Sequence, residues 1–192
     1  MNVYPKRANL ITLVTGSCRS GKSEWAEGLA TQSEKSVIYV ATAQADPDDL
    51  EWQNRIDLHQ RRRPADWKTL AVPVEIAAAI QSAEASECLL IDSLGTWLAN
   101  CLEQDEAVWQ QTVQQLMASL EQTSGSIILV AEETGWGVVP AYPMGRLFRD
   151  RLGNLTRQVG AIAHTVYLVT AGYALDLTQL GTPLQNQKAL KL

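Results

Sequence analysis

Short apolar segments rich in β-branched residues recur along the chain and predict β-strands. They cover Leu10–Thr15, Val37–Thr42, Cys88–Asp92, Ser126–Ala131 and Thr165–Thr170. Each segment is continuously apolar rather than alternating, which is typical of strands that are covered on both faces.

The stretches between these segments predict helices. They cover Lys22–Thr31, Pro47–Arg62, Val74–Ala85, Leu94–Leu102, Glu106–Gln122 and Gly145–Ala163. Because strands alternate with helices, we expect βαβ units and an α/β fold with a mainly parallel sheet flanked by helices. The sequence contains no repeat and no linker-like stretch, so residues 1–192 are expected to form one domain, with about 180–192 as a loose tail.

Composition limits the classes of function. Of the 192 residues, 46% are hydrophobic and 19% are charged, which is ordinary for a folded protein. The net charge of -5 argues against a general nucleic-acid binder, which needs a basic surface. The three cysteines form no CxxC pair and fit a reducing compartment better than a disulfide framework. No stretch approaches the roughly 18 apolar residues of a membrane span, so we expect a soluble, cytoplasmic protein.

A glycine-rich segment directly after the first predicted strand matches the pattern GxxxxGK[ST] in full. It consists of Gly16, Ser17, Cys18, Arg19, Ser20, Gly21, Lys22 and Ser23, and it opens the next predicted helix. A strand before this motif and a helix after it are the context expected for a phosphate-binding loop. We call Gly16–Ser23 the phosphate loop.

The residue types in the phosphate loop suit a nucleotide bound with Mg²⁺. Glycines let backbone N–H groups turn inward around phosphates, and the helix N-terminus adds partial positive charge. Lys22 is expected to reach the β- and γ-phosphates, and the Ser23 hydroxyl to ligate Mg²⁺. The alternative is a glycine-rich turn that carries an exposed lysine. Cys18 and Arg19 fill positions that the motif leaves free.

A second acidic element follows the predicted strand that ends at Asp92. A carboxylate at the end of a neighbouring strand commonly holds the metal of a nucleotide site, directly or through water. The alternative is a helix cap, because Asp92 and Ser93 precede an apolar helical stretch. Residues 92–95 also match the DxxG of switch GTPases, but the sequence has no NKxD motif for guanine recognition.

The segment from Arg55 to Lys68 is locally basic, with five Lys or Arg residues against two Asp. On a helix, Arg55, His59 and Arg62 share one face. One interpretation is a solvated charged helix end that Pro64 terminates. The other is a second phosphate-handling centre, in which arginines grip phosphate and a neutral His59 acts as a nucleophile.

Two further features have simpler interpretations. His164, before the last predicted strand, has no basic setting and is expected to be structural. The Gly/Pro-rich loop Gly135–Met144 follows a predicted strand, and loops at the carboxyl ends of strands are where α/β proteins bind ligands. We therefore expect this loop to be a lid or a substrate wall.

Six motifs occur in order: TGSCRSGKS (Thr15–Ser23), YVATAQ (Tyr39–Gln44), RIDLHQRRRPADW (Arg55–Trp67), LLIDSLGTWLANCL (Leu89–Leu102), ETGWGVVP (Glu133–Pro140) and FRDRLGNLTRQV (Phe148–Val159). With them, the chain from about Leu10 to Leu177 resembles the bifunctional adenosylcobinamide kinase / adenosylcobinamide-phosphate guanylyltransferase family of cobalamin biosynthesis. Many NTPases share the phosphate loop. The RIxxH…RPxxW and ExGxGxVP strings are much more specific.

The resemblance implies a three-layer, RecA-like P-loop NTPase fold and an enzyme with two transferase reactions. Adenosylcobinamide first takes the γ-phosphate of ATP or GTP. GTP then guanylylates a histidine, and the substrate phosphate displaces GMP to give adenosylcobinamide-GDP. The catalytic residues implied are His59, as the covalent nucleophile, and Lys22. The nucleotide contacts implied are Gly16–Ser23, Thr42, Ala43, Gln44, Gln60, Arg61, Arg62, Arg63 and Asp92, with Ser23 and Asp92 at Mg²⁺. The resemblance also implies a corrinoid substrate and a homo-oligomer, a trimer.

Three positions depart from the family pattern. Leu58 stands where some members have a histidine, and Ala71 stands where a glutamate is common. Glu132 replaces the first residue of a loop that often reads NEVG, which adds a carboxylate near the expected substrate. Two other functions stay open: a monofunctional small-molecule P-loop kinase, and a nucleotide-dependent binding or switch protein.

Overall fold

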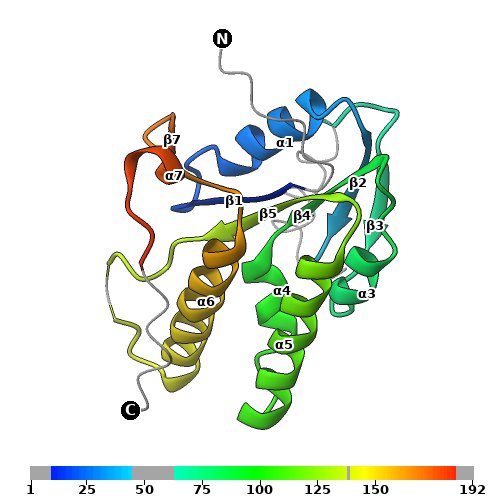
Figure 1. Ribbon diagram of the computed structural model, residues 1–192. Helices are drawn as coiled ribbons and strands as arrows, with labels where there is room; N and C mark the ends of the chain where they lie inside the picture. The colour runs from blue at the N-terminus through cyan, green and yellow to red at the C-terminus, as the bar shows by residue number, and fades with distance from the viewer. Residues whose placement is uncertain (1–9, 45–62, 138, 185–192) are drawn as a thin grey trace.

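The computed structural model describes residues 10–44, 63–137 and 139–184, and within them one sheet has seven strands (Figure 1). The strand order is β3-β2-β4-β5-β1-β6-β7. The strands are β1 (Ile11–Gly16), β2 (Ser36–Ala41), β3 (Lys68–Ala71), β4 (Glu87–Asp92), β5 (Ser126–Glu132), β6 (Thr165–Thr170) and β7 (Tyr173–Asp176). All neighbours pair in parallel except β6 and β7, which are antiparallel.

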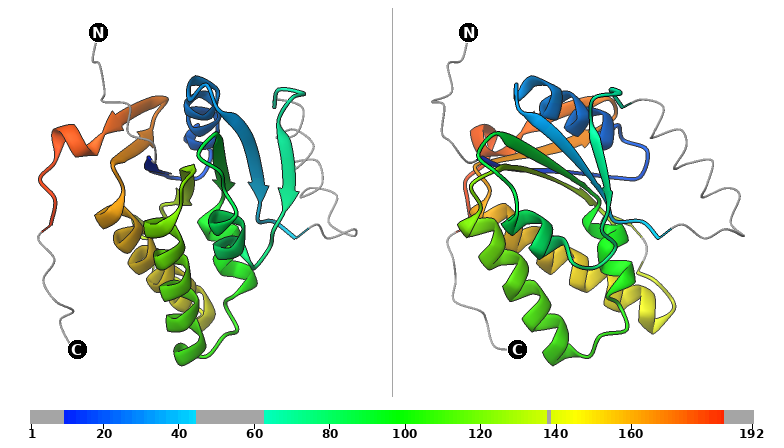
Figure 2. Two further views of the ribbon diagram at one scale, coloured as in Figure 1. Left: turned by 45° about the vertical axis from the view of Figure 1, so that its right-hand side comes forward. Right: turned by 90° about the vertical axis from the view of Figure 1, so that its right-hand side faces the viewer.

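The helices cover both faces of the sheet. They are α1 (Lys22–Gln32), α3 (Ile76–Gln81), α4 (Leu94–Asn100), α5 (Glu106–Gln122), α6 (Pro143–Ile162) and the short α7 (Leu177–Leu180). Figure 2 shows α1 on one side of the sheet and α3, α4, α5 and α6 on the other. This three-layer α/β arrangement confirms the expected fold class.

The core divides into two clusters, one on each face of the sheet. Leu13 packs with residues of α3–α6, whereas its neighbour Val14 packs with Ala26 and Ala30 of α1. Successive strand residues point to opposite faces, so a strand covered on both sides must be apolar at every position. The continuous apolar pattern of the sequence is the direct result.

The five strands predicted from the sequence are confirmed within one or two residues, and so are the helices at Lys22, Leu94, Glu106 and Gly145. The helix expected over Val74–Ala85 is shorter, Ile76–Gln81. The edge strands β3 and β7 were not predicted. All four residues of β3 are exposed, so no apolar segment marks it. The predicted helix Pro47–Arg62 lies outside the described residues.

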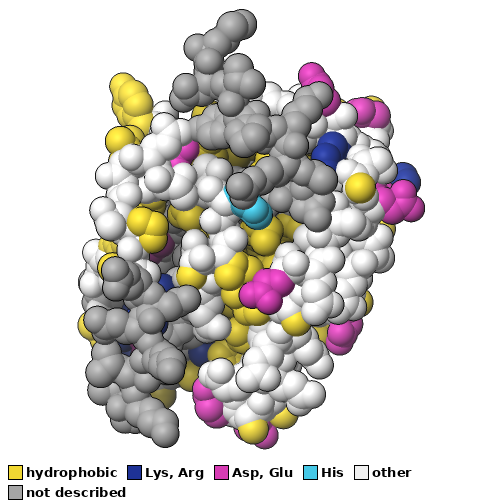
Figure 3. Space-filling view, in the orientation of Figure 1, with side chains coloured by type: hydrophobic (Ala, Val, Ile, Leu, Met, Phe, Trp, Pro, Cys, Tyr) yellow, Lys and Arg dark blue, Asp and Glu magenta, His cyan; other side chains and the backbone are white. Residues whose placement is uncertain are grey.

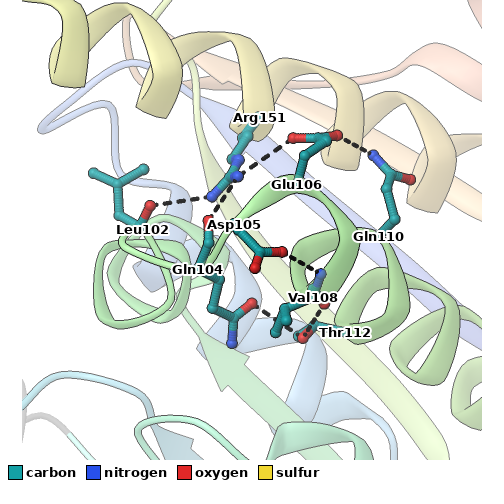
Figure 4. A network of polar contacts seen from close by, with 8 residues as sticks. All are labelled: Leu102, Gln104, Asp105, Glu106, Val108, Gln110, Thr112 and Arg151. Carbon is teal, nitrogen blue, oxygen red and sulfur yellow. Dashed lines mark hydrogen bonds and ion pairs between the residues drawn. The ribbon is translucent and has the colours of Figure 1, made fainter.

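Arg151 of α6 ties the connection between α4 and α5 to the helix layer (Figure 4). It is 6% exposed, and its guanidinium donates to the carbonyl oxygens of Leu102 at 3.1 Å and Gln104 at 2.9 Å. It also pairs with Glu106 at 3.3 Å and lies over the ring of Trp109. A buried cation thus supplies the donors that this loop's carbonyls need.

The strand order decides which polar residues meet. β5 lies between β1 and β4, and Gly16 is paired with Glu132 in the parallel register. The carboxyl ends of β4, β5 and β1 therefore bring Asp92, Glu132 and the phosphate loop to one edge of the sheet. Within the described ranges, no helix has both the length and the apolar character needed to span a membrane.

Candidate nucleotide-binding site

The phosphate loop connects the end of β1 to the start of α1. Gly21, the N-cap of α1, has φ +94°, and Arg19 has φ +57°, so the backbone is left-handed at both positions. At Gly16 a Cβ atom would lie 2.2 Å from the carbonyl oxygen of Val169 in β6. Both glycines are therefore required by the shape of the loop.

Lys22 is folded into the phosphate loop. It is 6% exposed, and its Nζ donates to the carbonyl oxygen of Ser17 at 3.3 Å. Ser20 Oγ is buried and has no hydrogen-bond partner among the described residues. A buried lysine and an unsatisfied hydroxyl around a helix N-terminus form a site for an anion. The alternative of an exposed lysine on a turn is therefore wrong.

Asp92, at the end of β4, is held by Tyr39 of β2. The Tyr39 hydroxyl donates to Asp92 Oδ2 at 3.0 Å. Burial, together with the Asp92 carboxylate, raises the pKa of the Tyr39 phenol well above its usual range, so the hydroxyl remains a donor. The N-cap of α4 is Ser93, whose hydroxyl and backbone form a capping box with Thr96. Ser93 and not Asp92 is therefore the cap of this helix, so the alternative role of Asp92 as a helix cap is wrong.

Glu132 has a structural role that the sequence did not indicate. Its Oε1 accepts from the Ser93 hydroxyl at 2.6 Å, and its Oε2 accepts from the backbone N–H of Gly95 at 3.0 Å. Both carboxylate oxygens are therefore engaged at the N-terminus of α4. The expectation that Glu132 places a carboxylate near the substrate stays a prediction. A Cβ at Gly95 would lie 2.1 Å from Oε2, so this carboxylate explains the glycine of the DxxG string.

Thr42, Ala43 and Gln44 follow β2 at the same edge. Thr42 is fully buried, and its hydroxyl accepts from Ser93 N at 2.9 Å and donates to Ser93 O at 2.8 Å. Asn100 donates to the Thr42 carbonyl at 2.8 Å. The Thr42 side chain thus joins β2 to α4, while Ala43 is half-buried and Gln44 is exposed.

Arg63 brings the end of the basic segment to this edge. Its guanidinium carbon lies 3.3 Å from the centre of the Tyr39 ring. Tyr39 thus contacts Asp92 through its hydroxyl and Arg63 through its ring. Leu58, His59, Gln60, Arg61 and Arg62 lie outside the described residues. Ala71 is exposed at the end of β3 and pairs with Ala41.

Glu133 was not singled out as a site residue from the sequence. Its backbone N–H donates to the carbonyl oxygen of Gly16 at 2.9 Å. Its Oε1 accepts from the Thr15 hydroxyl at 2.8 Å. The signal that could have indicated it is the ETGWGVVP motif, which begins at this residue.

His164 has a structural contact, and the three cysteines differ in exposure. His164 Nδ1 accepts from the backbone N–H of Ile11 at 3.1 Å, as expected for a structural residue. The three cysteines are free thiols. Burial raises the pKa of Cys88 and Cys101, whereas Cys18 is exposed on the phosphate loop.

The model of the family described as "Cobinamide kinase / cobinamide phosphate guanyltransferase" matches residues 12–177. The chain belongs to this family.

Two relatives of the cobinamide kinase / guanyltransferase family match most of the chain. The bifunctional adenosylcobalamin biosynthesis protein CobP of Pseudomonas aeruginosa is 42% identical over 174 residues, which is 90% of this chain and 98% of that protein. The bifunctional adenosylcobalamin biosynthesis protein CobU of Escherichia coli is 31% identical over 183 residues, 88% of this chain and 99% of that protein. A Pyrococcus horikoshii structure, PH0250, shares the fold with a TM-score of 0.54 at 6% identity, covering 88% of this chain and 86% of its own.

Proposed function

We propose that this member of the cobinamide kinase / guanyltransferase family carries out both reactions. It phosphorylates adenosylcobinamide with ATP or GTP, and it then transfers GMP from GTP to adenosylcobinamide phosphate. The observation that carries the proposal is the buried Lys22 in the phosphate loop, at the same edge of the sheet as Asp92. The family match over residues 12–177 supports it.

In the kinase step, the phosphate loop binds the triphosphate. Backbone N–H groups of the loop and the start of α1 face the phosphates, and Lys22 neutralises charge on the β- and γ-phosphates. Ser23 and Asp92 would hold Mg²⁺. Asp92 fits this role because only its Oδ2 is bonded by a described residue, which leaves Oδ1 for the metal or its water. Bound Mg²⁺ would offset the charge that develops between the β- and γ-phosphates.

In the guanylyltransferase step, His59 is the nucleophile. A neutral imidazole nitrogen attacks the α-phosphorus of GTP, a P–N bond forms, and pyrophosphate leaves. An oxygen of adenosylcobinamide phosphate then attacks the same phosphorus, the P–N bond breaks, and a diphosphate bridge results. Arg63 supports this assignment, because the described end of the basic segment contacts Tyr39 and so lies beside Asp92. Gln60, Arg61, Arg62, Ala43 and Gln44 are proposed to complete the nucleotide contacts.

The covalent intermediate gives a direct test. Incubation with α-labelled GTP should leave label in an acid-labile, base-stable phosphoramidate. His59→Ala should abolish this label while γ-phosphate transfer to cobinamide continues. Lys22→Ala should reduce both reactions by roughly a hundredfold or more, because both bind triphosphate in the same loop. Circular dichroism and thermal unfolding of each variant control for folding.

The outcomes separate the alternatives. Labelling that persists in a folded His59→Ala variant would show that another residue is the nucleophile. γ-Phosphate transfer without any covalent GMP would favour a monofunctional kinase. The switch-protein alternative has lost its main support, because Gly95 of the DxxG string packs against Glu132.

We also propose that the chain acts in the cytoplasm as a homo-oligomer, a trimer, with no nucleic-acid partner. Its three free cysteines suit a reducing compartment. Large apolar side chains are exposed close together in sequence at Trp136, Val139, Tyr142 and Met144. Figure 3 shows hydrophobic side chains gathered in the middle of one face as well. Exposed apolar surface of this kind is typical of contact between subunits.

A further inference from the structure

Glu133 is the first residue after β5 and lies beside the phosphate loop. Its backbone N–H bonds the carbonyl oxygen of Gly16, the first residue of the loop, at 2.9 Å. Its Oε1 accepts from the hydroxyl of Thr15, the residue before the loop, at 2.8 Å. Thr15 is only 5% exposed, so its hydroxyl is a fixed donor. Main chain and side chain together place the Glu133 carboxylate at the start of the loop.

The other two carboxylates at this edge of the sheet, Glu132 and Asp92, have different hydrogen-bond partners from Glu133. Glu132 has both oxygens bonded at the N-terminus of α4. Asp92 ends β4, which is separated from β1 by β5, and is held by Tyr39. Glu133 is half-buried, and its Oε2 has no hydrogen bond or ion pair with a described residue. It therefore offers an available proton acceptor directly after β5, the strand next to β1 and the phosphate loop.

Glu133 also connects the phosphate loop to the exposed loop that follows β5. Its bonds to Thr15 and Gly16 place it beside the phosphate loop, which is proposed to bind the phosphoryl donor. The residues directly after it are exposed and include Trp136, 67% exposed, in the loop that the sequence predicts to be a lid or a substrate wall. A general base must lie within hydrogen-bond reach of the hydroxyl that attacks, which is the region between donor and acceptor.

We propose that Glu133 is the general base of the kinase step, an inference that rests on the proposed function. The acceptor hydroxyl oxygen forms a bond to the γ-phosphorus, and the bond from that phosphorus to the β,γ-bridging oxygen breaks. The electron pair leaves with the nucleoside diphosphate. The hydroxyl proton passes to a Glu133 carboxylate oxygen and from there to water.

The guanylyltransferase step does not need this base. Its attacking groups are a neutral imidazole nitrogen of His59 and an ionised oxygen of the substrate phosphate. Each of these atoms attacks through a lone pair and has no proton to lose. Removal of the Glu133 carboxylate should therefore slow the kinase reaction and leave the guanylyltransferase reaction unchanged.

The test compares Glu133→Gln with wild type in two separate assays. Gln keeps an oxygen that can accept from Thr15 but cannot take a proton. Its kcat for phosphorylation of adenosylcobinamide should fall by about 10²- to 10⁴-fold. GMP transfer to adenosylcobinamide phosphate, supplied ready-made, and binding of ATP should stay within about twofold of wild type.

Two variants serve as controls. Glu132→Gln changes the neighbouring carboxylate, which bonds Ser93 and Gly95 at the start of α4. Its kinase rate at a temperature where it is folded should stay within a few-fold of wild type. Thr15→Val removes the donor to Glu133 but keeps the carboxylate, so its kinase rate should fall much less than that of Glu133→Gln.

Three results would overturn the assignment. A normal kinase rate in Glu133→Gln would show that no base acts there. Equal losses in both reactions would show that Glu133 shapes the phosphate loop instead. Recovery of the rate at high Mg²⁺ would make it a metal ligand. Failure of the wild-type enzyme to phosphorylate cobinamide would instead count against the proposed function.

Discussion

Tyr39 joins two parts of the site that are far apart in sequence. It opens the YVATAQ motif but was not predicted as a site residue, and at 4% exposure it resembles an ordinary core residue of β2. Its hydroxyl nevertheless donates to Asp92, and its ring lies under Arg63. The side chain is therefore a positioning residue for the proposed metal ligand and for the end of the basic segment.

Two substitutions should separate these contacts. Tyr39→Phe keeps the ring and removes the donor to Asp92, so the Mg²⁺ concentration for half-maximal kinase rate should rise about fivefold, the equivalent of one hydrogen bond of about 1 kcal/mol. Tyr39→Leu removes the ring as well, and the loss of the cation–π contact should also lower the yield of covalent GMP severalfold.

Titration of both reactions with Mg²⁺ measures the first effect, and α-labelled GTP measures the second. Thermal unfolding controls for the cavity that Leu leaves in the core. A Tyr39→Phe variant that lost the covalent GMP as strongly as Tyr39→Leu would contradict the separate roles of the hydroxyl and the ring.

Residue chemistry could be predicted where a motif sets the backbone. Gly16, Gly21 and Lys22 have the positions that GxxxxGK[ST] requires. The different roles of Glu132 and Glu133 could not be predicted. Both are glutamates that follow the same apolar stretch, and the sequence pattern does not distinguish them. Only the contacts to Ser93 and Thr15 distinguish them.

At the scale of elements, the helix layer is held together by Arg151 as well as by apolar packing. The buried guanidinium bonds two loop carbonyls between α4 and α5. The partner Glu106 is largely exposed, with 69% side-chain exposure, so the ion pair adds little and the two carbonyls account for most of the stabilisation.

Arg151→Met should lower the free energy of unfolding by about 3 kcal/mol, because it leaves these carbonyls without donors. Arg149→Met is the matched control. Arg149 pairs at 2.8 Å with the exposed Asp150, so its loss should cost less than about 1 kcal/mol. Urea unfolding followed by circular dichroism measures both, and equal effects would contradict a structural role for Arg151.

Elements with an apolar signal were predicted, and elements without one were missed. The strands at the centre of the sheet must be apolar on both faces, and helix α5 was predicted with its observed bounds, Glu106–Gln122. The edge strand β3 is exposed at every residue, and β7 is only partly covered. Main-chain pairing with a neighbour creates such strands, and a single sequence does not display it.

At the scale of the whole molecule, the order of the strands could not be predicted from the sequence. Alternation of strands and helices indicates a parallel sheet but leaves open which strand lies next to β1. The placement of β5 there, rather than β4, brings Glu133 to the phosphate loop and leaves Asp92 one strand away.

Assembly is the property of the whole molecule that can be tested most directly. Sedimentation equilibrium should give three times the chain mass of 21.1 kDa. If the exposed apolar residues after β5 form the contact, Trp136→Asp combined with Tyr142→Asp should lower the measured mass. Tyr173→Asp, at a residue that is 75% exposed on β7, should not. A single chain mass for wild type would contradict the trimer.

Because Glu132 and Glu133 are adjacent and have different contacts, the site depends on the exact number of residues in β5. The strand is hydrogen-bonded to β1 on one side and β4 on the other, so its register is set along its whole length. One inserted residue within β5 would shift Glu132 to the position that Glu133 now has and move Glu133 one position beyond it, and each side chain would point to the opposite face. The length of β5 thus determines which carboxylate contacts α4 and which contacts the phosphate loop. This chain can therefore vary in length beyond Thr134 far more readily than within Ser126–Glu132.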